Sequence, residues 1–238
     1  MERSALWQGL DRLSVIAVLV VAGLVGWRVL VPAGQPTRQA TTVPTPEEPV
    51  PMGNRAMLGS GTAPVGMIVF SDFECPFCGR FARETWPAVR DKYVTTGRVS
   101  VAFWHVPLEN IHPLARRAAE LADCAGRQGR FWEFHDRMFG VGLPGSAGAP
   151  PLSEEVVQAG IRGAGLDNSA LDKCASDVAP GDVQSDIAAA TKFGVRSTPT
   201  FFLGTLSNGT LKVSKVISGA KPLVTFTEDL DSLLGKTK

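Results

Sequence analysis

Two cysteines that closely follow an apolar run restrict the fold of this chain more than any other feature of its sequence. The run VGMIVFS, residues 65–71, has the length and the β-branched content of a buried strand. Cys75 and Cys78 follow it, separated by Pro76 and Phe77. Proline suits the first turn of a helix, because its missing N–H would have no partner inside the helix. The stretch therefore predicts a strand, a short loop and a helix that begins at Cys75.

A cysteine at the N-cap of a helix is suited to thiol chemistry. The free N–H groups of the first turn and the positive end of the helix dipole stabilise a thiolate. We therefore expect the pKa of Cys75 to lie below the ordinary value of about 8.5. Cys78, one turn further on, can close a disulfide with Cys75 and act as the resolving thiol. Because such a helix stabilises the reduced form, the disulfide should be an oxidant.

Metal binding and a purely structural staple are the alternatives for this cysteine pair. A metal would need further ligands, but a second C-x-x-C is absent and His105, His112 and His135 show no paired spacing. A disulfide that closes so short a loop restricts the unfolded chain little, which disfavours a structural staple. We therefore expect redox exchange without a metal or another cofactor.

The N-terminal part of the chain predicts a membrane anchor. After a tail (1–12) comes LSVIAVLVVAGLVGWRVLV, residues 13–31, in which Arg28 is the only charge. A helix of this length spans about 28 Å, roughly the thickness of the hydrocarbon core of a bilayer. A cleaved signal peptide ending at the VPA of residues 31–33 is the alternative. Residues 32–59, rich in proline, are expected to form an extended linker that holds the folded domain away from the membrane.

The charge of the chain argues against nucleic-acid binding, and its expected compartment predicts a second disulfide. The chain has 24 basic and 23 acidic side chains and a formal net charge of +1, without the basic stripe that nucleic-acid binding requires. We expect a single-pass membrane protein whose catalytic domain lies on the extracytoplasmic side, periplasmic or extracellular. In an oxidising compartment unpaired thiols are a liability, so Cys124 and Cys174 are expected to form a structural disulfide. Two separate buried thiols are the alternative.

The remaining patterns predict an α/β domain with a helical insertion. The helix from Cys75 should run to about Thr96 with a kink at Pro87, and residues 98–106 should form a second strand. A block of helices follows at about 112–178, and another helix is expected at 181–193. The Asn-Gly pair at 208–209 predicts a hairpin, and an amphipathic helix closes the chain. The order is a β-α-β half, the insertion, and an α-β-β-α half.

Four segments resemble the DsbA-like thiol–disulfide oxidoreductases of the thioredoxin superfamily. They are VFSDFECPFCGRF (69–81), FWHVPL (103–108), HPLARRAAELADCAGRQGRFWEFHDRMF (112–139) and GVRSTPTFFLG (194–204). The resemblance covers about residues 60–236 and implies a thioredoxin-like fold for residues 60–238. It also implies that Pro199 is a cis-proline opposite Cys75, and that the backbone of Thr198 binds an extended substrate peptide. From the residues alone, Pro199 could equally be an ordinary strand-initiating proline.

The function that this resemblance implies is the exchange of the Cys75–Cys78 disulfide with cysteines of secreted or exported proteins. The expected partners are unfolded or partly folded proteins with free thiols, and a membrane redox partner that reoxidises the pair. A disulfide reductase or isomerase runs the same chemistry in reverse. A non-catalytic peptide- or metal-binding module is the alternative from a different class.

Side chains around the two cysteines bear on how oxidising the couple is. The most strongly oxidising relatives of this family carry Pro-His between the cysteines, whereas this chain carries Pro76 and Phe77. Phe77 supplies neither a hydrogen bond nor a charge, so we expect a less oxidising potential. Asp72 and Glu74 would raise the pKa of the thiol if they lie close to it, and are otherwise ordinary loop charges.

Overall fold

The computed structural model describes residues 43–53, 56–142 and 152–237. The predicted N-terminal tail (1–12), the transmembrane anchor (13–31) and the first part of the linker (32–42) lie outside the described residues. Within the described ranges, no helix has the length and apolar character needed to cross a membrane.

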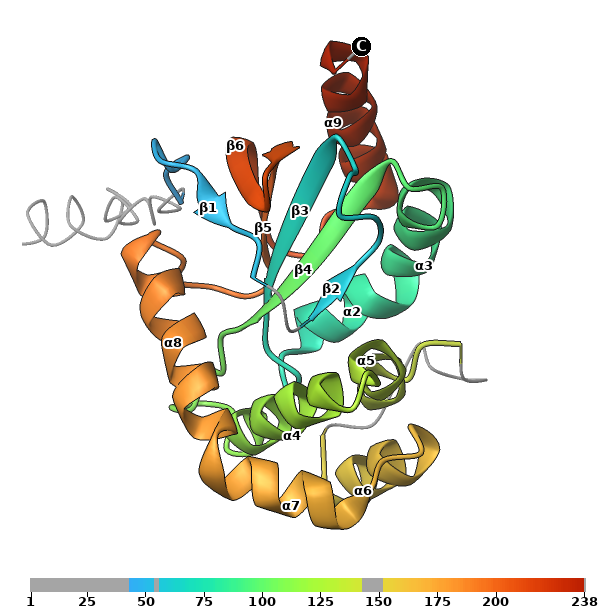
Figure 1. The fold of residues 1–238 in the computed structure, drawn as a ribbon, viewed down its shortest axis with the longest axis vertical. Helices are drawn as coiled ribbons and strands as arrows, with labels where there is room; N and C mark the ends of the chain where they lie inside the picture. The colour runs from blue at the N-terminus through green and yellow to red at the C-terminus, as the bar shows by residue number, and fades with distance from the viewer. Residues whose placement is uncertain (1–42, 54–55, 143–151, 238) are drawn as a thin grey trace, which may run out of the picture. The chain divides into compact units, whose positions relative to one another are not determined.

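A mixed six-stranded sheet forms the centre of the described part of the chain (Figure 1). Its strand order is β1-β6-β5-β3-β4-β2. The long strands are β3 (Val65–Ser71), β4 (Val99–His105), β5 (Thr200–Ser207) and β6 (Thr210–Ser218). β3 and β4 pair in parallel, and the other pairs are antiparallel. Because β3 and β4 are buried along their whole length, their sequences are largely apolar rather than alternating.

The hairpin of β5 and β6 turns at the predicted Asn-Gly pair. Asn208 has φ 49° and Gly209 has φ 73°. Two consecutive residues with positive φ give a turn whose twist matches that of the strands it joins. The local sequence signal therefore suffices to fix this connection.

Helices cover both faces of the sheet (Figure 1). On one face, α2 (Pro76–Glu84), α3 (Trp86–Val89), the π-helical turn η1 (Arg90–Val94) and α9 (Leu223–Lys236) pack on apolar side chains of β3, β4 and β5. On the other face lie α8 (Ala179–Lys192) and the segment that contains β1. The single kinked helix predicted to reach about Thr96 is divided, since α2 already ends at Glu84. The ring of Pro87 cannot continue the hydrogen-bond ladder of α2, so a new helix starts beside it.

The predicted helical insertion is present between β4 and β5. It contains α4 (Ala115–Arg127), α5 (Phe131–Phe139), α6 (Glu154–Gly163) and α7 (Asn168–Asp177). These helices enclose a hydrophobic cluster of their own, which also contains both cysteines of the C-x-x-C. Cys124 of α4 and Cys174 of α7 are joined by a disulfide, with Cα atoms 5.8 Å apart. The structure thus contains the pairing expected from the sequence.

Part of the predicted linker 32–59 belongs to the sheet instead. β1 (Val50–Pro51) pairs with β6 at one edge, and β2 (Met57–Leu58) pairs with β4 at the other. Val50 is fully buried, and Met52 is 1% exposed. Proline is tolerated on an edge strand because its missing N–H costs no hydrogen bond there. A Pro-rich composition therefore did not prevent these residues from entering the core.

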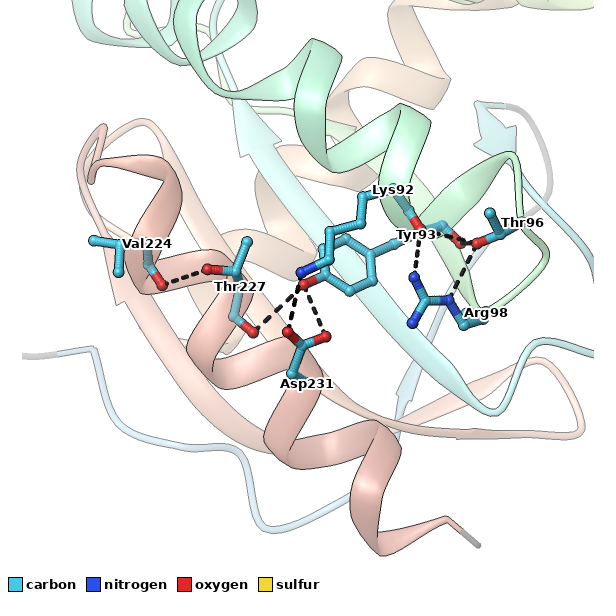
Figure 2. A network of polar contacts seen from close by, with 7 residues as sticks. All are labelled: Lys92, Tyr93, Thr96, Arg98, Val224, Thr227 and Asp231. Atoms are coloured by element: carbon cyan, nitrogen blue, oxygen red, sulfur yellow. Dashed lines mark hydrogen bonds and ion pairs between the residues drawn. The ribbon is translucent and has the colours of Figure 1, made fainter.

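A polar network ties η1 to α9 (Figure 2). The hydroxyl of Tyr93, the only tyrosine of the chain, donates to Asp231 Oδ1 over 2.9 Å. The Lys92 ammonium lies 3.1 Å from Asp231 Oδ2 and 4.9 Å from the centroid of the Tyr93 ring. Arg98 donates to the carbonyl oxygen of Lys92 over 2.6 Å, and its guanidinium lies 5.0 Å from the same ring centroid. The last helix is thus held to the rest of the domain by a tyrosine that is itself buried.

Candidate active site

Cys75 lies at the N-cap of α2, directly after the loop that leaves β3. Its backbone is extended, with φ −71° and ψ 121°, and Pro76 occupies the first turn of the helix as predicted. The side chain is only 5% exposed, so the thiol is less accessible than a free N-cap position suggests. Its exposed neighbour is Phe77, 53% exposed, with the Arg80 guanidinium 5.1 Å from the ring centroid.

The surroundings of Cys75 stabilise its thiolate. Its pKa is lowered from 9.0 to about 6, and the largest cause is the hydrogen bond from the Cys78 thiol. Burial opposes this shift, while Thr198 and the backbone amides of Cys78 and Phe77 lower the pKa further. The amides of the first turn therefore act in the expected direction, but the neighbouring thiol contributes more than they do.

The surroundings of Cys78, in contrast, destabilise its thiolate. It is 1% exposed, and burial raises its pKa well above the ordinary value. A negative charge on Cys75 raises it further, and hydrogen bonds from Ser71 and the backbone of Asp72 only partly oppose this. In the reduced pair described here, Cys78 is thus the protonated donor and Cys75 the charged acceptor.

The segment around Pro199 lies against Cys75, as the resemblance implied. The Thr198–Pro199 peptide bond is cis, and Cys75 Sγ lies 3.5 Å from the carbonyl oxygen of Thr198. These residues are 123 positions apart in the chain. The Thr198 hydroxyl is buried and has no hydrogen-bond partner among the described residues other than the adjacent thiol.

The two carboxylates beside the C-x-x-C bind the helical insertion rather than the thiols. The Asp72 side chain is fully buried, and its Oδ2 accepts hydrogen bonds from the Leu108 amide at 2.8 Å and from His112 Nδ1 at 2.6 Å. Glu74 Oε2 accepts one from the Leu114 amide at 2.8 Å. Neither carboxylate is among the main groups that shift the pKa of Cys75. They fasten the active-site loop to the start of α4.

The predicted site residues thus fall into two groups. Cys75, Cys78, Thr198 and the proline after it come together at the carboxyl end of β3, where α2 begins. Cys124 and its disulfide partner lie within the helical insertion. The described residues contain no group of three or more histidine, cysteine or acidic side chains placed to hold a metal ion.

Sequence reasoning missed three contributors to the site. Ser71, at the end of β3, hydrogen-bonds Cys78. His112 pairs with Asp72. Arg80 supplies a cation beside Phe77. Ser71 and Arg80 stand close to the C-x-x-C and contact residues of α2, whereas the partner of Asp72 is 40 positions away and could be identified only from the tertiary structure.

Comparison with known proteins assigns the chain to a family. The thioredoxin family model matches residues 52–210, two thirds of the chain. Among solved structures, α-DsbA1 from Wolbachia pipientis superposes with a TM-score of 0.65 and 25% identity. That match covers 79% of this chain and 94% of the Wolbachia protein.

Two curated relatives extend the comparison. The Na(+)/H(+) antiporter NhaA 3 of Salinispora tropica is 31% identical over 206 residues, which are 81% of this chain but only 29% of the antiporter. Disulfide bond formation protein D of Bacillus subtilis is 24% identical over 163 residues, 62% of this chain and 66% of that protein. The family match and the fold agree with the geometry around Cys75. The chain therefore belongs to the thioredoxin family, among its DsbA-like members.

Proposed function

We propose that this protein is a thiol–disulfide oxidoreductase that oxidises thiols of exported proteins. The observation that carries the proposal is the opposite electrostatics of its two thiols, with Cys75 stabilised as a thiolate and Cys78 held protonated. The better leaving group is the thiol of lower pKa. A mixed disulfide at Cys75 is therefore readily released from this protein.

The reaction consists of two exchanges. A substrate thiolate attacks Cys75 Sγ of the oxidised pair, so that the Cys75–Cys78 bond breaks and a mixed disulfide forms. A second substrate thiolate then attacks the substrate sulfur, and Cys75 leaves as its stabilised thiolate. Two substrate thiols are thereby oxidised and the cysteine pair is reduced. The carbonyl of Thr198, beside Cys75 Sγ, supplies a backbone acceptor for an extended substrate peptide.

The proposed setting is the extracytoplasmic side of a membrane. The apolar segment 13–31 and the prolines that follow it support a retained single-pass anchor. The Cys124–Cys174 disulfide fits an oxidising compartment. A membrane redox partner would reoxidise the Cys75–Cys78 pair after each cycle.

The direction of electron flow follows from the stabilised Cys75 thiolate. Stabilising the reduced form makes the disulfide oxidising. Phe77 lacks the charge and hydrogen bond of a histidine at its position, so the couple should be less oxidising than that of a Pro-His relative. It should still lie above about −300 mV, the range of structural disulfides. Phe77→His should raise the potential.

The decisive experiment is equilibration of the full chain in glutathione buffers, combined with exchange assays on a reduced, unfolded protein. Wild type should oxidise the substrate, and Cys75→Ser should abolish exchange. A potential below about −300 mV, or a lowered potential in Phe77→His, would establish a reductase or isomerase instead. Wild type that binds peptides but transfers no disulfide would indicate a non-catalytic binding module.

A further inference from the structure

Cys78 lines a small cavity. The volume of this cavity is about 10 Å³, close to the space that a single water molecule requires. Most of its lining is apolar, but five residues with polar side-chain atoms contribute to its wall, namely Ser71, Cys78, Trp86, Trp132 and His135. The indole N–H of Trp86 is buried without a hydrogen-bond partner among the described residues. A buried cavity of this size with polar groups in its wall is suited to one bound water.

His135 connects this cavity to a carboxylate. The residue stands on α5 and is 4% exposed. Its Nδ1 lies 2.9 Å from Asp136 Oδ1, and Asp136 Oδ2 lies 3.0 Å from Arg90 Nη1. A carboxylate at Nδ1 fixes the tautomer of an imidazole and leaves Nε2 to exchange a proton. The hydrogen bond to Asp136 therefore holds the His135 imidazole in the tautomer that proton transfer through Nε2 requires.

The side chain of Asp136 is partly exposed to solvent. Together with Arg90, Trp132 and Glu133 it lines an open pocket of about 460 Å³. Trp132 also lines the inner cavity, so its indole separates the two spaces. The hydrogen bond between His135 and Asp136 thus links a cavity at the buried thiol to a pocket that solvent can enter.

We propose that His135 and Asp136 form a proton relay for Cys78, completed by a water molecule in the cavity. The proposal rests on the proposed function and deepens it. When Cys78 leaves the active-site disulfide as a thiolate, a proton passes from the His135 imidazolium through the water to Cys78 Sγ. On reoxidation the path runs in reverse, so Cys78 loses its proton to His135 and attacks the mixed disulfide at Cys75. The proton is returned to solvent through the pocket beside Asp136.

The buried environment of Cys78 means that this thiol needs a proton acceptor in order to ionise. Burial raises the pKa of this thiol well above its ordinary value, so unaided ionisation at neutral pH is rare. Among the described residues, the charged and titratable groups at the His135 ring are Cys78 across the cavity, Asp136 at Nδ1 and Arg90 beyond it. The ring contacts Phe103 and Phe131, which also contact the imidazole of His105. Otherwise it is enclosed by aromatic side chains, which exclude bulk water: Phe73, Trp86, Phe103, Phe131, Trp132 and Phe139.

The test mixes the reduced full chain with oxidised glutathione and follows both exchange steps by rapid quench. The second-order rate at low glutathione reports attack by Cys75, and the limiting first-order rate reports resolution by Cys78. His135→Gln should slow the first-order step by roughly 10²-fold at neutral pH, as removal of a general base does. Asp136→Asn should slow it by a smaller factor, and neither variant should change the second-order step. Arg137→Gln, an exposed change on the same helix that does not line the pocket beside Asp136, is the matched control.

The pH dependence separates a relay from a structural effect. Rates of His135→Gln and wild type should converge at alkaline pH, where Cys78 ionises without help. A first-order rate in His135→Gln equal to wild type at neutral pH would overturn the proposal, as would equal slowing at every pH. A wild type that forms the mixed disulfide normally but never resolves it would instead refute the proposed function itself.

Discussion

The hydrogen bond from Cys78 to Cys75 can be removed without removing the nucleophile. It is the largest cause of the fall in the Cys75 pKa from 9.0 to about 6. Hydrogen bonds to charged groups contribute about 1.5–3 kcal/mol. One pKa unit corresponds to about 1.4 kcal/mol, so Cys78→Ala should raise the pKa of Cys75 by about one to two units. Cys78→Ser keeps a hydroxyl donor and should leave the pKa close to its wild-type value.

Alkylation rates measured across a pH series provide the assay. In both Cys78 variants Cys75 is the only free thiol, because Cys124 and Cys174 are joined in a disulfide. The labelled site is therefore unambiguous. An unchanged Cys75 pKa in Cys78→Ala would refute the reasoning. Equal shifts in the alanine and serine variants would show that packing, rather than the hydrogen bond, sets the pKa.

The same shift predicts how the stability of the reduced protein depends on pH. A thiol whose pKa is lower in the folded state stabilises that state fully above its unfolded pKa, here 9.0. This stabilisation disappears as the pH falls through about 6. At pH 7 the Cys75 thiolate should contribute about 1.4 kcal/mol, and at pH 5 almost nothing. The raised pKa of Cys78 affects stability only above its ordinary value, so it leaves this window unchanged. Denaturant unfolding of the reduced chain between pH 5 and pH 8 checks the trend, with Cys75→Ser as the variant that should lose it.

Three further predictions concern the scaffold. Replacing both Cys124 and Cys174 by alanine should lower the free energy of unfolding by roughly 4 kcal/mol, since their disulfide closes a loop of about fifty residues. Denaturant melts should show this loss, and an unchanged midpoint of unfolding would contradict it. Tyr93→Phe should lower the free energy of unfolding by about 1 kcal/mol, because it removes the hydrogen bond from the Tyr93 hydroxyl to Asp231 of α9. Denaturant melts measure this change as well. An unchanged free energy of unfolding would show that the network in Figure 2 does not stabilise the fold. Asp72→Asn should destabilise the fold by about 1–3 kcal/mol in denaturant melts by weakening the hydrogen bonds to this buried side chain, and His112→Gln should show part of that loss.

Local signals in the sequence predicted much of this structure. The strand and helix around Cys75 and the hairpin at Asn208 each depend on residues within a few positions of one another. In these places backbone conformation follows from side chains nearby. The cis-proline at Pro199 was instead expected from family resemblance, since no local pattern specifies it.

Other features depended on partners distant in the chain. The strand at residues 57–58 is too short and too near prolines to give a periodic signal, and pairing with β4 alone defines it. Asp72 reaches a histidine 40 positions away, and His135 shares a cavity with a cysteine of the α2 helix. Such contacts exist only after tertiary packing. No window of sequence around either residue contains them.

The short strands β1 and β2 have a mechanical consequence. They lie at opposite edges of the sheet although only a few residues separate them in the chain (Figure 1). Between these edges the Met52 carbonyl accepts a hydrogen bond from the Trp104 indole of β4 over 3.2 Å. A pull on the N-terminal side of Val50 would first peel β1 from β6 and then draw Met52 away from that indole. Val50 and Met52 pack on the face of the sheet opposite α2, so the force would act on that face. Tension applied from the N-terminal side would therefore disturb the far side of the domain before it reached the thiols.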